Sequence, residues 1–202
     1  MKKNIIAISL TLLISGAGFG QTDPRLADQI NKMYELDQSV QTDLMAAAQK
    51  GETKEKMDEH YKKIKDTFKN HIPVLKKIIT EKGFPTYDMV GKEAAGNFFT
   101  MIQHADSDLA FQKACLKIVE KLVKKNQADG RSFAYLTDRV NINSGKPQIY
   151  GTQLEYKNGE AFSKNLGNAK EVNKRRAKLR MEPLEDYLKK ATEFHQQMNK
   201  KN

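Results

Sequence analysis

Cysteine is nearly absent from this chain of 202 residues, and tryptophan is missing altogether. The single cysteine, Cys115, excludes an internal disulfide, so no covalent cross-link of this kind holds the fold together. Cys115 shares one helical face with Phe111, Ile118 and Leu122, at spacings of four, three and four residues. Because a free thiol on an apolar face packs as a small hydrophobic group, we predict a buried, unreactive Cys115 rather than a nucleophile.

The chain also has little continuous hydrophobic sequence. Its one apolar run covers residues 5–14, which is too short for a permanent membrane span of roughly 20 residues. Lys2 and Lys3 precede the run and small residues follow it over 15–20, which is the pattern of a cleavable export signal. We expect a signal peptide over residues 1–20. Residues 21–202 would then form a single mostly helical domain, secreted or periplasmic, with no stable membrane anchor after cleavage.

Acidic residues are fewer than basic ones, and the formal net charge is +10. The lysines are spread along the chain instead of forming one basic tract, and no basic stretch is interleaved with aromatic residues. A scattered excess of this kind favours solubility and a weak attraction to anionic surfaces. Nucleic acid is therefore not an expected partner.

Apolar residues recur at helical spacing along most of the chain. Asp23 and Pro24 provide an N-cap and a proline at the first helical position. Pro73 predicts a kink or break near residues 70–72 of the second helix. The small residues Ala94 and Ala95 would let a neighbouring helix approach closely. The predicted helices cover residues 24–49, 57–83, 92–104, 107–125 and 129–140.

The stretch from residue 141 to residue 166 changes character. Alternating β-formers and the turn signal Lys157-Asn158-Gly159 predict a small β-hairpin near residues 148–164. Helical signals resume at Asn168, and another helix follows Pro183. The predicted fold class is mainly α, a compact helical bundle with a small β-hairpin.

A polar stretch at the junction of two predicted helices suggests catalysis. His104 and Asp106 are close enough in sequence for the carboxylate to orient the imidazole as a general acid or base. The alternative is structural, with Asp106 or Asp108 capping the next helix and His104 hydrogen-bonded at the junction. The His-x-Asp-x-Asp spacing matches no established zinc pattern, so we predict no metal and no other cofactor.

Three further polar stretches supply candidate ligand-binding groups: an Asp-Arg pair near a helix end, a glycine between hydrogen-bonding side chains in the hairpin region, and two consecutive arginines. The arginines cannot both face the same direction on a helix, so at least one should point inward and need an anionic partner. Exposed ion pairs and a solvated basic helix face remain the alternatives. The candidate ligand-binding residues are Gln103, Gln112, Asp138, Arg139, Tyr150, Thr152, Gln153, Arg175 and Arg176.

The combination of these stretches resembles an uncharacterised bacterial family, domain of unknown function 6624. The resemblance rests on 103-QHAD-106 with 111-FQ-112, 134-AYLTDRV-140, Gln148 with 150-YGTQ-153, Arg175-Arg176, 183-PL-184, 187-YL-188, Asp37-Gln38 and 83-GFPT-86. It covers nearly all of residues 21–202, and departs at Phe84, where the family is expected to favour tryptophan. It implies one compact domain with the polar stretches in one site, and it implies no reaction.

Two hypotheses follow from these residues. In the first, a polar pocket binds a small anionic or amide-bearing ligand, with His104 as acid/base, Asp106 as its orienting partner, and the tyrosine, glutamine and arginine groups as hydrogen-bond donors. In the second, the protein is a non-catalytic envelope or interaction domain, and the same residues form an internal hydrogen-bond network. The sequence alone decides neither this choice nor the oligomeric state.

Overall fold

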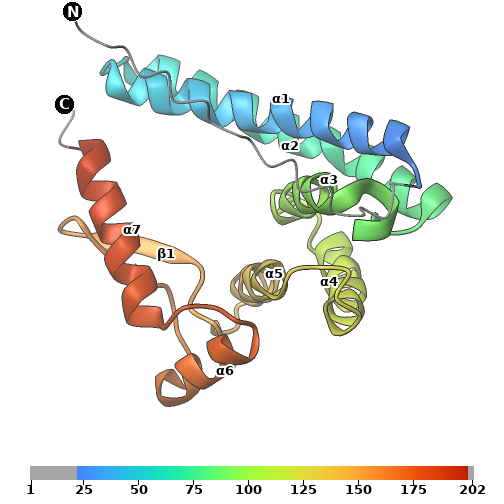
Figure 1. Ribbon diagram of the computed structural model, residues 1–202. Helices are drawn as coiled ribbons and strands as arrows, with labels where there is room; N and C mark the ends of the chain where they lie inside the picture. The colour runs from blue at the N-terminus through green and yellow to red at the C-terminus, as the bar shows by residue number, and fades with distance from the viewer. Residues whose placement is uncertain (1–21, 200–202) are drawn as a thin grey trace, which may run out of the picture.

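The structure is a computed structural model, and it describes residues 22–199. Within that range the chain is mainly helical with one small two-stranded antiparallel sheet (Figure 1), which confirms the predicted fold class. The predicted export signal over residues 1–20 lies outside the described residues. The elements are α1 (Pro24–Gln49), α2 (Lys54–Lys82), α3 (Tyr87–Gln103), α4 (Leu109–Lys124), α5 (Gly130–Asn143), β1 (Leu154–Lys157), β2 (Glu160–Ser163), the 3-10 turn η1 (Ala169–Glu171), α6 (Val172–Lys178) and α7 (Leu184–Asn199).

Aspartates begin three of the helices. Asp23 accepts a hydrogen bond from the backbone nitrogen of Leu26 at 3.0 Å, and Pro24 follows it as predicted. Asp108 accepts from the nitrogen of Phe111 at 2.9 Å, and Asp129 caps α5. Such caps satisfy backbone N–H groups that have no partner within the helix. Because Asp108 caps α4, the carboxylate of Asp106 is available for a different role.

Helix α2 passes through Pro73 without interruption, so the break predicted near residues 70–72 does not form. A proline inside a helix leaves the carbonyl four residues earlier without its N–H donor. Here Pro73 and Lys69 both lie on the exposed face, where water can solvate that carbonyl. The opposite face buries Ile72 and Leu75 in the core, and this packing offsets the local cost.

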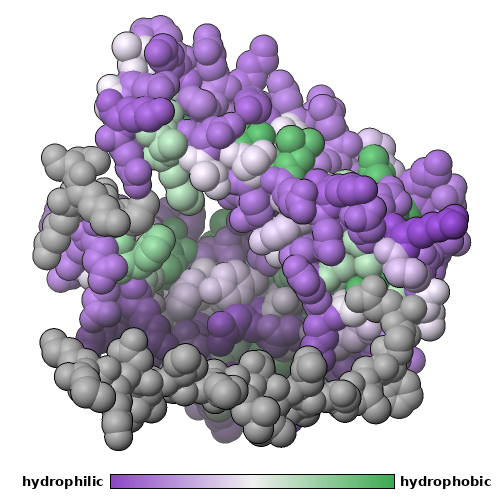
Figure 2. All heavy atoms as spheres, turned by 45° about the horizontal axis from the view of Figure 1, so that its top comes forward, coloured by the Kyte–Doolittle hydropathy of each residue, from purple (hydrophilic) through white to green (hydrophobic). Residues whose placement is uncertain are grey.

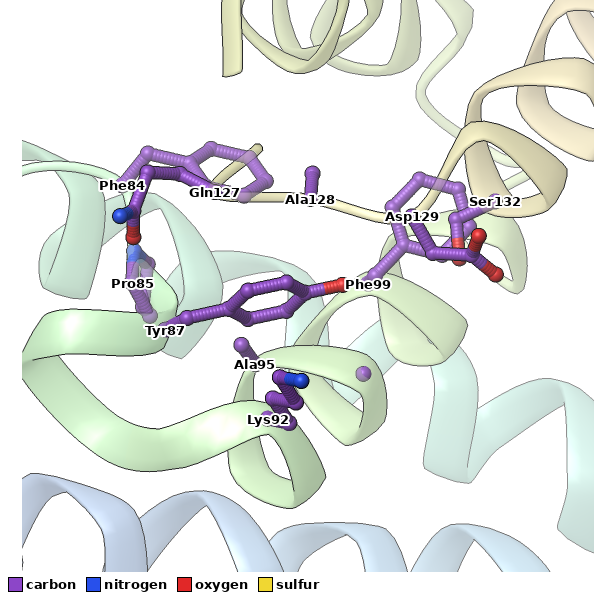
Figure 3. A pocket seen from close by; sticks show the side chains of 11 residues that line it. Phe84, Pro85, Tyr87, Lys92, Ala95, Phe99, Gln127, Ala128, Asp129 and Ser132 are labelled. Atoms are coloured by element: carbon purple, nitrogen blue, oxygen red, sulfur yellow. The ribbon is translucent and has the colours of Figure 1, made fainter. Parts of the chain in front are cut away.

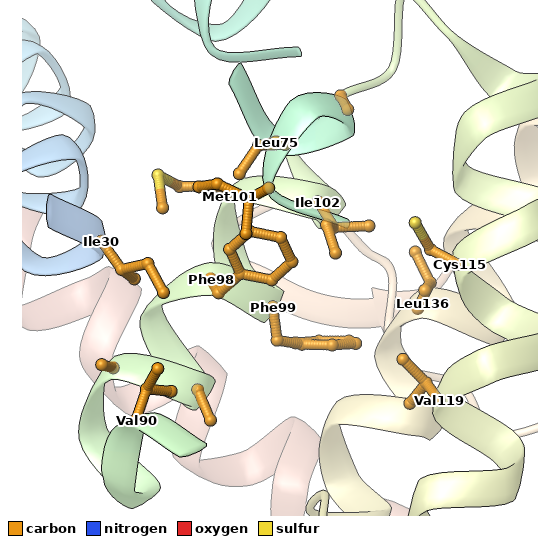
Figure 4. Packing of buried hydrophobic residues seen from close by; sticks show 14 of the residues in the cluster. Ile30, Leu75, Val90, Phe98, Phe99, Met101, Ile102, Cys115, Val119 and Leu136 are labelled. Carbon is orange, nitrogen blue, oxygen red and sulfur yellow. The ribbon is translucent and has the colours of Figure 1, made fainter. Parts of the chain in front are cut away.

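Helix α3 lies at the centre of the hydrophobic core. Phe98 and Ile102 are fully buried, and α3 packs against α1 and α2 on one side and against α4 and α5 on the other (Figure 4). Gly91 interrupts the first turn of α3 with a φ of 78°, a conformation that favours glycine. Cys115 is buried in this core, and burial raises the pKa of its thiol to about 12. The predicted burial of Cys115 is therefore confirmed, and the raised pKa disfavours the reactive thiolate.

The hairpin and the last helix form a separate layer beside the core (Figure 1), with α7 packed against β2. The turn at Asn158 and Gly159 has positive φ at both residues, as the Asn-Gly pair predicts, and joins Lys157 to its partner Glu160. The strands are shorter than the predicted hairpin. Residues 148–153 instead form an irregular loop that wraps around a buried carboxylate described below.

The surface is mostly polar. On the face drawn in Figure 2, hydrophilic side chains predominate, hydrophobic ones form small separate groups, and the centre is hollowed. Within residues 22–199, none of the helices has both the length and the apolar character that a membrane crossing requires.

Replacing Gly151 with alanine tests how tightly the loop is packed. Its φ is +73°, and an added Cβ would lie 2.8 Å from Oγ of Ser163 and 2.9 Å from a methyl carbon of Leu184. Gly145 has nearly the same φ, +72°, but a Cβ there meets nothing within 4 Å. We expect Gly151→Ala to lower the free energy of unfolding by about 2 to 4 kcal/mol, and Gly145→Ala by about 1 kcal/mol. Denaturant titrations measure both, and equal losses would show that the loop does not pack as described.

Candidate functional site

A buried carboxylate holds the imidazole of His104. Asp37, in the middle of α1, is completely buried, and its two carboxylate oxygens lie 3.0 and 2.9 Å from Nδ1 of His104. Gln38 and Gln41 donate amide hydrogen bonds to the same carboxylate, at 2.9 and 3.2 Å. Since an ionised carboxylate can only accept, Nδ1 is the donor and the other ring nitrogen, Nε2, carries the free lone pair.

Two side chains of α2 complete the surroundings of this pair. The ring of Phe68 stacks on His104 with centroids 4.3 Å apart. His71 is buried, and its Nδ1 lies 3.9 Å from the carboxylate of Asp37 without a hydrogen-bond partner. Burial lowers the pKa of His71; the charge of Asp37 acts in the opposite direction, and His104 reinforces the lowering. In the part of the chain that the structure describes, no three His, Cys, Asp or Glu side chains are arranged to hold a metal ion.

A cavity of about 350 Å³ opens beside His104, between α2 and the α3–α4 junction. We call it the junction pocket. The His104 side chain keeps 16% of its surface exposed, and no hydrogen bond within residues 22–199 occupies Nε2. The imidazole is therefore held through Nδ1 by Asp37, and part of the ring is exposed at the pocket. The pocket is lined by Tyr61, Ile64, Lys65, Phe68, Lys69, His104, Asp106 and Ser107.

Asp106 lines the junction pocket but does not orient His104, so that part of the sequence-based hypothesis was wrong. Its carboxylate accepts two hydrogen bonds from the guanidinium of Arg139, at 2.8 and 2.5 Å, and one from Asn143 at 2.9 Å. Burial raises the pKa of Asp106, but the bonds and charge of Arg139 outweigh burial, so the pKa lies below its ordinary value. Asp106 and Arg139 thus form an ion pair at the pocket rim.

Gln112 secures the turn that carries His104 and Asp106. It is fully buried, and its amide nitrogen donates to the backbone carbonyls of Ile102 and Gln103 and to Asp106, at 3.0 to 3.2 Å. These bonds hold the last carbonyls of α3, one of which, that of Ile102, also accepts from the backbone nitrogen of Ala105. Of the two predicted ligand-binding residues, Gln112 therefore holds the junction together, and Gln103 takes part in these bonds through its backbone carbonyl.

Asp138 anchors the loop that precedes the hairpin. The side chain is completely buried and accepts hydrogen bonds from the backbone nitrogens of Ile149, Tyr150 and Thr152 and from the hydroxyl of Thr152, at 2.8 to 3.1 Å. A carboxylate that accepts several backbone N–H groups is strongly stabilised, and it orders the chain around it. We call this set of bonds the loop anchor.

Two buried polar side chains extend the loop anchor. Gln148 donates to the carbonyls of Gln153 and Lys164 and accepts from the nitrogen of Gln153 at 2.7 Å. Arg176, only 1% exposed, donates to the carbonyls of Glu182 and Tyr150 at 2.7 and 2.8 Å and lies over the Tyr187 ring. Its inward direction agrees with the sequence argument, but carbonyl oxygens take the place of the expected anionic partner.

Arg175 also binds backbone. It donates to the carbonyls of Ile149, Gly167 and Asn168, at 2.6 to 3.3 Å. Tyr150 packs its ring against Phe133, and burial together with the charge of Asp138 raises the pKa of its hydroxyl. These contacts tie residues 148–153 to α5 and α6.

The candidate residues therefore form two groups instead of one shared site. His104, Asp106 and Arg139 border the junction pocket, whereas Tyr150, Arg175 and Arg176 belong to the loop anchor and make no hydrogen bond to His104. Among the side chains that the structure describes, one hydrogen bond connects the groups: Arg139 donates to the side-chain oxygen of Gln153 at 3.4 Å.

Sequence reasoning missed Asp37 and His71 as site residues, although a signal was present. In α1 the apolar stripe Leu26, Ile30, Met33, Val40 and Leu44 skips one position, and Asp37 occupies it. A charged side chain at a core position requires a partner in the interior. From the sequence we noted Asp37 only as part of the family resemblance.

These features define a class of protein: a helical chain with a buried Asp–His pair that opens on a small pocket, and a polar anchor that attaches a hairpin to the core. The chain belongs to the family described as "Family of unknown function (DUF6624)", which matches residues 24–197. No curated protein and no solved structure matches it.

Replacing Asp138 tests the loop anchor. Asp138→Asn keeps the size of the side chain but turns an NH₂ group toward donors that need an acceptor, so we expect a loss of about 2 to 4 kcal/mol in the free energy of unfolding. Asp66→Asn, on the exposed face of α2, should change it by less than about 0.5 kcal/mol. Urea denaturation of the three proteins measures the difference. A variant at Asp138 as stable as the parent would contradict the anchor.

His71 should contribute to the pH dependence of stability. Because burial lowers its pKa from 6.5, the unfolded chain binds a proton there at a pH where the folded chain does not. Stability from this residue is therefore complete above about pH 7 and falls as pH drops through 6.5 toward the lower folded pKa. His71→Asn should flatten the decline between about pH 7.5 and 5.5. Parallel declines in both proteins, measured by urea denaturation, would be the opposite result.

Proposed function

We propose that the protein binds a small anionic or amide-bearing molecule in the junction pocket and that His104 exchanges a proton with it. One observation carries the proposal: Nδ1 of His104 is held by the fully buried Asp37 at 2.9 Å while the same ring borders an open cavity of about 350 Å³. A side chain that only filled space at a helix junction would not need a buried carboxylate to orient it.

The Asp37–His104 pair suits general acid–base chemistry. The hydrogen bond to Asp37 selects the tautomer with the proton on Nδ1, which leaves the lone pair on Nε2 of the neutral ring. When Nε2 takes a proton, the resulting imidazolium is attracted to the negative charge of the Asp37 carboxylate. Ser107 lines the same pocket, but no hydrogen bond within residues 22–199 joins it to His104. The proposal is therefore proton transfer and not attack by a serine.

The charges around the pocket favour an anionic ligand. Lys65 and Lys69 lie exposed at its edge and form no ion pair with any described residue. The one acidic side chain of the lining, Asp106, is already paired with Arg139. The half-buried amide oxygen of Gln153 accepts a hydrogen bond from Arg139, and Arg139 in turn donates to the Asp106 carboxylate at the rim. A carboxylate or phosphate would thus meet cations close to the imidazole that exchanges the proton.

The rival hypothesis is a non-catalytic interaction domain whose polar residues form an internal hydrogen-bond network. The contacts favour this structural role for the residues of the loop anchor and not for those of the junction pocket. In the loop anchor, Asp138, Gln148 and Arg176 are almost completely buried and hydrogen-bonded, and Nη2 of Arg176 is the one of their buried side-chain atoms without a hydrogen-bond partner. Buried networks of this kind specify packing and need no ligand. We therefore assign Tyr150, Thr152, Arg175 and Arg176 a structural role and restrict the proposed ligand site to the junction pocket.

A ligand screen followed by substitution tests the proposal. The purified protein is screened by thermal shift against small carboxylates, phosphate monoesters and amides, since a molecule that binds only the folded state raises its apparent stability. For a ligand found in this way, His104→Gln should remove the shift or lower turnover at least about 100-fold, the usual contribution of acid–base catalysis. Circular dichroism checks that the variant is folded.

His60→Gln provides a matched control, because His60 lies on α2, which borders the pocket, but is next to Glu52 and does not line the pocket. It should leave both binding and turnover unchanged. A folded His104→Gln that retains the full shift and full turnover would refute the assignment, as would a ligand whose effect is lost equally in both variants.

A further inference from the structure

A second hollow lies away from the junction pocket and shares no lining residue with it. Two adjoining cavities, of about 300 and 510 Å³, are bounded by the start of α3, the α4–α5 loop and the α6–α7 loop. They share Tyr87, Lys92, Ala128 and Asp129, so they form one continuous depression, which we call the amphipathic groove. Volumes in this range are typical of small-molecule sites.

The smaller cavity is apolar. Phe84, Pro85, Tyr87 and Phe99 form its walls, and the Tyr87 side chain extends across it toward Phe99 and Asp129 (Figure 3). Its aromatic rings offer flat surfaces to a flat apolar group. Hydrogen bonds from the side chain of Gln127 to Asp88 and from the backbone of Asp88 to Gln127, at 2.9 and 3.3 Å, hold the two sides of the cavity at this separation.

The surroundings of Gly96 show that the apolar cavity contains open space and is not only a contact between packed helices. We predicted that small residues in this part of α3 admit a neighbouring helix, and Ala94 and Ala95 are indeed buried. A Cβ added at Gly96, however, would meet nothing within 4 Å. The space beside Gly96 is open, although an alanine there would favour the helix by roughly 0.5 to 1 kcal/mol.

The larger cavity is cationic. Lys92 lines it from α3, and Lys178 and Arg180 line it from the end of α6 and the residues after it; none of them pairs with a carboxylate among the described residues. The fourth cation, Arg131, is already paired with Glu182 at 3.3 Å. The one acidic residue, Asp129, accepts the backbone N–H of Arg131 as the cap of α5. The groove therefore combines an aromatic slot with an unneutralised positive charge next to it.

We propose that the amphipathic groove binds a small molecule with a flat apolar body and one anionic group. The apolar body lies between the rings of Phe84, Tyr87 and Phe99, and the anion meets Lys92, Lys178 and Arg180. The order of the two halves sets the selectivity: a neutral aromatic molecule leaves the cations without a partner, and a small inorganic anion leaves the aromatic slot empty. This site is independent of His104 and of the proposed proton transfer.

A pair of fluorescent probes separates the two contributions. Anilinonaphthalene sulfonate has an aromatic body and one sulfonate, and phenylnaphthylamine has nearly the same body without the charge. Titrated into the folded full chain, the sulfonate should bind at one site per chain and at least about tenfold more tightly than the neutral probe, the ratio that one charged contact of 1.4 kcal/mol provides. Equal affinities would overturn the proposed anion contact. Cooperative urea unfolding must be retained, since partly unfolded chains also bind this dye.

Two variants locate the binding. Gly96→Leu fills the apolar cavity from within α3 and should weaken sulfonate binding at least about tenfold with no loss of melting temperature. The double variant Lys178→Glu/Arg180→Glu should weaken sulfonate binding by a similar factor and leave the neutral probe unaffected. Should Gly96→Leu fail to fold, the surface double variant still decides the question.

The control is a double charge reversal of the same size at the other pocket, Lys65→Glu/Lys69→Glu. It changes the net charge equally, so it should leave sulfonate binding in the groove intact. Equal losses in the two double variants would mean that the probe senses only overall charge, and undiminished binding in a folded Gly96→Leu would mean that the slot is not occupied. Either result would refute the groove without affecting the assignment of His104.

Discussion

The arrangement of the hairpin, α6 and α7 depends on the hydrogen bonds that the carboxylate of Asp138 accepts. The continuous hydrophobic core ends at Val140 in α5, and no residue beyond it belongs to that cluster within residues 22–199. The four hydrogen bonds that Asp138 accepts and the buried guanidinium of Arg176 tie these C-terminal elements to α5, and Val172, Met181 and Leu184 add a small buried apolar group of their own. A two-stranded sheet has little stability by itself, so these polar bonds supplement a small apolar contact.

Helix α5 connects this attachment to the junction pocket. Asp138 and Arg139 are neighbours in sequence, but successive helical residues point about 100° apart. One therefore faces the loop anchor and the other faces Asp106 at the α3–α4 junction. Because Gln153 belongs to the anchored loop and contacts Arg139, the position of the loop and the position of the Asp106 carboxylate are set together. The anchor thus supports the shape of a pocket that it does not line.

The interior of the bundle solves a different problem, the burial of a charge. Asp37 lies in the apolar stripe of α1, where an isolated carboxylate would be expensive to bury. His104, Gln38 and Gln41 all donate to it, and the orphan Nδ1 of His71 stands 3.9 Å away. An apolar side chain would pack at this position without such partners. Core packing therefore does not account for the charge of Asp37, whereas its bond to the imidazole of His104 does.

Most of the helices and the hairpin turn were predictable because their causes are local. Asp23-Pro24 specifies the start of α1, and Asn158-Gly159 specifies the turn between β1 and β2. The uninterrupted α2 was not predictable in this way, because the burial of Ile72 and Leu75 against other helices outweighs the local effect of Pro73. The hairpin predicted near residues 148–164 begins only at Leu154 for a similar reason, since the carboxylate of Asp138 accepts backbone N–H groups of residues 149–152.

The sequence by itself determined the helical class, the caps, the turn and the identity of the polar stretches, because each of these depends on residues within a few positions of one another. Only the tertiary structure decided which polar groups meet. The partner of His104 is 67 residues away in sequence, in α1, and not two residues away at Asp106. Spacing along a chain carries no information about such a pairing, because it arises when α1 and α3 pack side by side and bring one buried charge against one imidazole.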